Sequence, residues 1–76
     1  MPELRPIDYR GFEKFLFYIG CEFKRQKGSH RIYTRSDLIR PIVVPAVKDV
    51  SVLVIRSNLK TLQITVEKYL DILGKI

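Results

Sequence analysis

A two-residue Gly28-Ser29 step divides residues 21–35 into two runs of alternating character, and this feature most constrains the fold. Two alternating runs separated by two residues, the first of them Gly, predict a β-hairpin closed by a type II′ turn. In such a turn the flanking residues Lys27 and His30 are directly opposite one another. The sequence therefore predicts two antiparallel strands with the chain's only histidine beside the turn.

Counting back from the turn gives the rest of the hairpin register. Arg25 then pairs with Ile32, and Phe23 pairs with Thr34. In this register Phe23 and Ile32 share the core face of the sheet, whereas the polar outer face carries Glu22, Lys24, Gln26, Arg31, Tyr33 and Arg35.

The flanking segments predict helices and one more strand. Asp8 is a suitable N-cap for a helix over 9–19, where apolar residues recur at helical spacing. A third strand is expected over 40–44, and Thr65 caps a short last helix. Residues 50–62 begin with β-branched side chains but keep a helical spacing, so the pattern alone leaves strand and helix open.

These elements predict one α+β domain over residues 1–76, because a chain of 76 residues has room for one core only. The expected order is α-β-β-β-α, with a three-stranded antiparallel sheet and the helices on one face. We expect the core to contain Phe12, Phe15, Leu16, Ile19, Phe23, Ile32, Val43 or its neighbours, Leu59 and Leu62.

The charge distribution favours an anionic partner. The chain carries a net charge of +6, of which residues 22–40, with six basic and two acidic side chains, supply +4. One cysteine, Cys21, and one histidine cannot form an internal disulfide or a structural Cys/His metal cage, and Cys21 is expected to be a small buried apolar residue. With no apolar run long enough to cross a membrane and no signal-peptide core, we expect a cytoplasmic protein.

The string Arg25-Gln26-Lys27-Gly28-Ser29-His30, followed by Val44-Pro45 at a strand end, resembles the HicA-type mRNA interferase toxins of type II toxin-antitoxin systems. The segments 55–60 and 64–70 resemble the helix and capped tail that usually close that family. The resemblance spans almost the whole chain, and its most specific part is the Gly-Ser-His turn in a basic hairpin.

The resemblance implies a double-stranded-RNA-binding-domain-like fold and favours helix over 50–62. It also implies a histidine that cleaves single-stranded mRNA and a HicB-type antitoxin that inhibits the protein, which we expect to be acidic and to cover the hairpin. Two departures from the family pattern stand out: Ala46 or Val47 replaces a second histidine, and Gln63 replaces a glycine.

The chemistry expected at the hairpin needs no metal or cofactor, because RNA supplies its own nucleophile, the 2′-hydroxyl. His30 is then the general base, and Lys27 lies directly opposite it, where its charge can stabilise the phosphate. The side chains and backbone expected to bind RNA belong to Lys24, Arg25, Lys27, Gly28, Ser29, Arg31 and Tyr33.

Two other functions fit the same residues. The basic hairpin could grip phosphates without cleaving RNA, as a binding module, or it could bind an acidic protein chain. The cations have a plain structural interpretation as well, because charged hairpin edges prevent aggregation.

Overall fold

The computed structural model describes residues 3–76; residues 1 and 2 of the predicted domain lie outside the described part. The elements follow the order α-β-β-β-α-α, with the bounds α1 Tyr9–Tyr18, β1 Glu22–Lys27, β2 His30–Thr34, β3 Ile42–Pro45, α2 Val52–Leu62 and α3 Val66–Leu73. The sheet is antiparallel with strand order β1-β2-β3. The predicted α+β class and the α-β-β-β-α order are confirmed, and α3 follows as a third helix.

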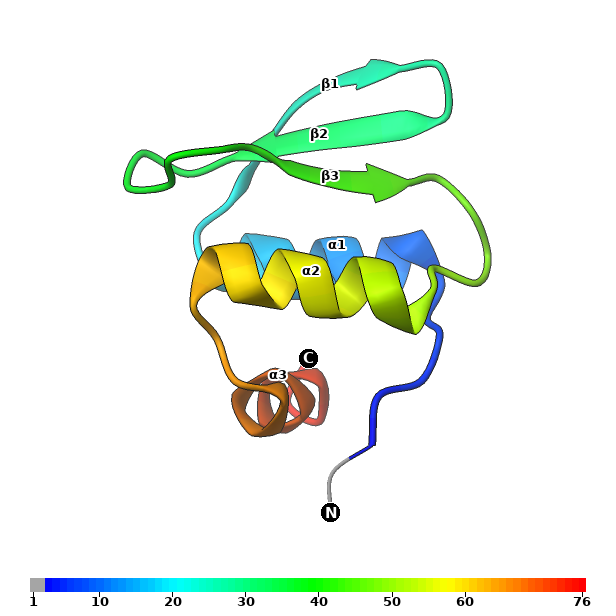
Figure 1. The fold of residues 1–76 in the computed structure, drawn as a ribbon, viewed down its shortest axis with the longest axis vertical. Coiled ribbons are helices and arrows are strands. Elements are labelled where there is room, and N and C mark those ends of the chain that lie inside the picture. Colours follow the sequence, from blue (N-terminus) through cyan, green and yellow to red (C-terminus); the bar gives the residue numbers. More distant parts are fainter. Residues whose placement is uncertain (1–2) are drawn as a thin grey trace.

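The molecule has three layers (Figure 1). The sheet forms the first, α1 and α2 lie side by side beneath one of its faces, and α3 packs on the far side of these two helices. The hairpin turn and the β2–β3 loop stand at opposite ends of the sheet (Figure 1). Within residues 3–76 no helix is long and apolar enough to span a membrane.

The helix ends follow from local chemistry. The Asp8 side chain accepts a hydrogen bond from Arg10 N at 2.9 Å, and Thr65 accepts one from Lys68 N, so both predicted N-caps are confirmed. Helix α1 ends at Tyr18, and Gly20, just after the C-cap Ile19, has a φ of +92°, the left-handed conformation that closes a helix.

The segment whose pattern was ambiguous is a helix from Val52 onward. Ser51 caps it by accepting a hydrogen bond from Val54 N at 3.3 Å. Val50, just before the cap, instead pairs with Ile7 in an isolated bridge. The β-branched residues are therefore divided between a bridge and the first turn of α2.

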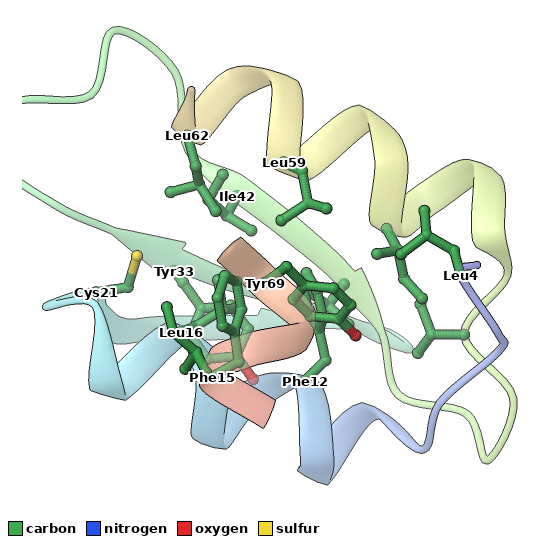
Figure 2. Packing of buried hydrophobic residues seen from close by; sticks show 14 residues of the cluster. Leu4, Phe12, Phe15, Leu16, Cys21, Tyr33, Ile42, Leu59, Leu62 and Tyr69 are labelled. Carbon is green, nitrogen blue, oxygen red and sulfur yellow. The ribbon is translucent and has the colours of Figure 1, made fainter. Parts of the chain in front are cut away.

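The core lies between the sheet and the helices, and Tyr69 of α3 packs into it between α1 and α2 (Figure 2). The Tyr69 ring meets Phe15 edge-on at a centroid distance of 4.8 Å. Most of the predicted helical core is confirmed as buried, namely Phe12, Phe15, Leu16, Leu59 and Leu62, and Ile19 packs against it partly buried. On β3 the neighbours of Val43, Ile42 and Val44, are buried and Val43 itself is exposed.

The predicted faces of β2 were wrong. The pairs Lys27–His30 and Arg25–Ile32 are confirmed, but an irregularity between Phe23 and Arg25 shifts the register, so that Phe23 pairs with Tyr33 instead of Thr34. Tyr33 is fully buried in the core, whereas Phe23 is 41% exposed and Ile32 does not belong to the core. A tyrosine can replace an aliphatic residue here because its hydroxyl finds a hydrogen-bond partner, described below.

Candidate functional site

The two faces of β2 have different surroundings. Arg31 and Tyr33 face α1, since both bond to Glu13 of that helix. Because side chains alternate along a strand, His30 and Ile32 point to the opposite face, which no helix covers (Figure 1). His30 therefore lies on the uncovered face of the sheet.

His30 has a neighbour on each side across the sheet. Lys27 of β1 is its partner in one direction and Pro45 of β3 in the other. In the next row, Ile32 lies between Arg25 and Val43. The histidine is exposed. Lys27 and Arg25 of β1 are therefore the cations next to His30 and Ile32 on this face.

Hydrogen bonds to the carbonyls of Gly28 and Ser29 stabilise the turn that positions His30. Gly28 has a φ of +60° and Ser29 has no positive φ, as the predicted type II′ turn requires. Gln26 Nε2 donates to the Gly28 carbonyl at 3.0 Å, and Ala46 N donates to the Ser29 carbonyl at 2.7 Å. A Cβ added at Gly28 would meet no atom within 4 Å, so the space beside the turn is open.

The cations on this face are free to bind an anion. Lys24, Arg25 and Lys27 are exposed, and none of them forms an ion pair within residues 3–76. Lys24 and Arg25 also line a shallow groove of about 290 Å³ that continues along the sheet toward the β2–β3 loop. The arrangement offers an imidazole and several unpaired cations to a polyanion on one surface.

Arg31 and Tyr33 are not part of this surface. Glu13 Oε2 accepts hydrogen bonds from Arg31 Nη2 at 2.9 Å and from the Tyr33 hydroxyl, while Arg31 Nη1 donates to Gln26 Oε1 at 2.8 Å. Arg31 also stacks on the Phe23 ring, at 4.2 Å from the ring centroid. Both residues were predicted to lie on the outer face and contact RNA; in the structure they join the hairpin to α1, and Tyr33 is too buried to stack on a base.

Burial and hydrogen bonding change the pKa values of Tyr33 and Arg31. Loss of solvent, together with the hydrogen bond to Glu13, raises the pKa of Tyr33 to about 12. Hydrogen bonds to Tyr33 and Glu13 raise the pKa of Arg31. Sequence reasoning did not single out Glu13, because nothing in the local pattern of the first helix relates it to Arg31 and Tyr33, which follow 18 and 20 residues later.

The remaining candidates lie away from the imidazole. Cys21 is buried as expected, at the start of the hairpin far from the turn, and burial raises the pKa of its thiol. Ala46 lies beside the turn, where its N–H donates to the Ser29 carbonyl, and neither Ala46 nor Val47 carries a titratable group. In the part of the chain that the structure describes, no cluster of three His, Cys, Asp or Glu side chains could hold a metal ion.

The fold and the site together define a small α+β domain with an uncovered, basic sheet face that carries one histidine. The family model described as "HicA toxin of bacterial toxin-antitoxin" matches residues 9–64, from the start of α1 to just beyond α2. The chain belongs to this family. Comparison with the curated proteins gave no match, and neither did comparison with the solved structures.

Proposed function

We propose that this protein is an endoribonuclease toxin that cleaves single-stranded mRNA with His30 as general base and without a metal ion. The observation that carries the proposal is the placement of His30 on the uncovered sheet face, opposite Lys27 and beside the row that holds Arg25. Membership of the HicA toxin family supports the toxin role. Residues 1–76 would act as one domain, in the cytoplasm, where mRNA is found.

The proposed reaction uses the substrate's own nucleophile. Neutral His30 removes the proton of a ribose 2′-hydroxyl, whose oxygen attacks the adjacent phosphorus and displaces the 5′-oxygen of the next nucleotide. Lys27 and Arg25 stabilise the charge that develops on the phosphate. The products are a 2′,3′-cyclic phosphate and a 5′-hydroxyl, and water or Lys27 supplies the proton that the leaving oxygen takes up.

The turn contributes backbone and open space. Gly28 and Ser29 lie between the cation and the imidazole, and the absence of any neighbour within 4 Å of a Cβ at Gly28 allows a phosphate to approach closely. Lys24 extends the cationic surface along the groove. The proposed RNA-binding residues are therefore Lys24, Arg25, Lys27, Gly28 and Ser29.

The decisive variant is His30→Ala. His30 is an exposed residue at the end of a hairpin, so its removal should leave the fold and RNA binding intact while abolishing cleavage. The measurement compares cleavage of a labelled RNA by the wild type, by His30→Ala and by Lys68→Ala on α3 as a control. Circular dichroism checks that all three fold.

Substrate and product analysis tests the chemistry. We expect wild-type cleavage to survive EDTA, to leave 2′,3′-cyclic phosphate ends and to fail on DNA, which lacks the 2′-hydroxyl. Full activity of His30→Ala, or activity that depends on a metal ion, would refute the mechanism.

A non-catalytic RNA-binding module is the second candidate, favoured by the free cations, which can bind phosphates without help from His30. Salt-sensitive RNA binding by the wild type with no cleavage would establish it. In either case a toxin of this family implies an antitoxin. We propose that it is a HicB-type protein, acidic enough to cover the basic hairpin.

A further inference from the structure

The β2–β3 loop, residues 35–41, is the most exposed apolar feature of the described chain. Ile39 at its tip is 100% exposed. A single exposed aliphatic side chain is ordinary on a protein surface, but this one stands on a projecting loop at the end of the sheet opposite His30 (Figure 1). The proposed nuclease chemistry does not use it.

The loop is held in one conformation by Arg35. Its guanidinium contacts both carboxylate oxygens of Asp37, at 2.6 and 3.1 Å, and donates to the Ile19 carbonyl at the end of α1 at 2.9 Å. Leu38 N also donates to the Arg35 carbonyl at 2.9 Å. Because the loop is already ordered, a partner that binds Ile39 loses little conformational entropy.

Ile39 stands between two hollows of the surface. One, of about 580 Å³, lies between the loop and the second half of α2, and the other is the groove of about 290 Å³ on the uncovered sheet face. Four loop residues line both hollows, namely Arg35, Leu38, Ile39 and Arg40. A chain laid across the loop could therefore contact both sides of Ile39.

The charges around the loop are positive. Arg40 lines both hollows, Lys60 lines the larger and Arg25 the smaller, and within residues 3–76 these three form no ion pair. The only acidic side chain lining either hollow, Asp37, is neutralised by Arg35. The surface thus matches a partner that carries carboxylates around an apolar side chain.

We propose that the β2–β3 loop is a docking site for the antitoxin protein, which places an apolar side chain against Ile39 and carboxylates on Arg40 and Lys60. The inference rests on the antitoxin partner proposed above and does not depend on His30 chemistry. A ribose-phosphate chain would bind the cations but would gain little from contact with the exposed aliphatic side chain of Ile39. Protein interfaces, in contrast, bury such side chains at their centre. The observations therefore favour a protein over RNA at this loop.

The test uses the full chain and, as probe, the protein encoded by the adjacent reading frame. Ile39→Ser and Arg40→Glu are compared with two controls, Leu53→Ser, another exposed aliphatic residue, and Lys68→Glu on α3. We expect each loop variant to weaken the complex at least about tenfold in a titration, and the controls to change it less than about twofold. RNA cleavage by the free Ile39→Ser protein should stay at the wild-type rate, because this substitution removes no cation from the RNA-binding surface.

Other outcomes would overturn the docking proposal. Loop variants that bind the probe as tightly as the wild type would do so, as would a wild type that forms no complex. Loss of RNA binding with an intact protein complex would assign the loop to RNA instead. The His30→Ala cleavage assay needs no partner, so the proposed nuclease can fail or succeed independently of this test.

Discussion

Arg31 of β2 donates two hydrogen bonds to the same carboxylate oxygen of Glu13 in α1, from Nη2 at 2.9 Å and from Nε at 3.1 Å. Both side chains are only 20% exposed, so the ion pair is partly shielded from water. The Tyr33 hydroxyl donates to the same oxygen. The strand that begins at His30 is therefore bound to α1 through the residue that directly follows the histidine.

Removing the shared acceptor should destabilise the fold. In Glu13→Ala Arg31 loses its ion pair and the buried Tyr33 hydroxyl loses its hydrogen-bond acceptor, and we expect the free energy of unfolding to fall by about 1.5–3 kcal/mol. Urea denaturation measures the loss. Glu22→Ala, which removes an exposed carboxylate of β1 without an ion pair in residues 3–76, is the control and should change stability by less than about 0.5 kcal/mol. Equal effects of the two variants would contradict this role for Glu13.

Stability should fall in alkaline solution because two core tyrosines resist ionisation. Burial raises the pKa of both Tyr33 and Tyr69 from 10.0 to about 12. Between these values the unfolded chain releases the phenolic protons while the folded protein keeps them, so the free energy of unfolding decreases as pH rises. Each tyrosine contributes up to about 3 kcal/mol of this decrease.

Denaturation series at several pH values measure the slope of stability against pH. Tyr69→Phe should make the slope shallower between pH 10 and 12, and Tyr18→Phe, at an exposed position, should leave it at the wild-type value. A Tyr69→Phe slope as steep as that of the wild type would show that this ring does not control alkaline unfolding.

The end of α2 carries removable strain. Gln63 has a φ of +58°, and Ile64 N donates to the Leu59 carbonyl at 3.0 Å, the pattern of a helix end that favours glycine. We expect Gln63→Gly to stabilise the protein by about 0.5–1 kcal/mol, because relief of the left-handed strain exceeds the entropy cost of glycine. A thermal melt checks it. Lys60→Gly, inside the same helix, should instead destabilise by about 1 kcal/mol, and a lower melting temperature for Gln63→Gly would be the contrary result.

The two faces of the hairpin should respond differently to salt. In a His30→Ala background, which prevents cleavage, Lys27→Ala should weaken RNA binding and reduce the slope of log affinity against log salt by about 0.7 for each phosphate that the variant no longer neutralises. Arg31→Ala should lower stability while leaving that slope unchanged, because Arg31 pairs with Glu13. Fluorescence anisotropy across a salt series makes the comparison. A larger change of slope for Arg31→Ala than for Lys27→Ala would reverse our assignment of the faces.

The sequence by itself determined the local structure of this protein. Asp8 and Thr65 cap helices because a short polar side chain satisfies free N–H groups within its own turn of chain. Gly28 gives the turn its positive φ, and the turn gives the pairing of Lys27 with His30. The caps, the turn and the pairing beside it each depend on residues only a few positions apart. They can therefore be predicted from the sequence without knowledge of the fold.

Only the tertiary structure decided which face of the hairpin is buried. The buried Tyr33 hydroxyl donates a hydrogen bond to Glu13, which lies 20 residues away in the chain. The register shift near Phe23 is likewise visible only in the folded hairpin. Without Glu13, Arg31 would have no ion pair and the buried Tyr33 hydroxyl no acceptor for its proton, and the aliphatic Ile32 would be the better choice for the core. The alternation of polar and apolar residues along a strand cannot reveal such a partner. The free-energy cost of burying a polar side chain becomes small only when another element, distant in the sequence, supplies its hydrogen bond.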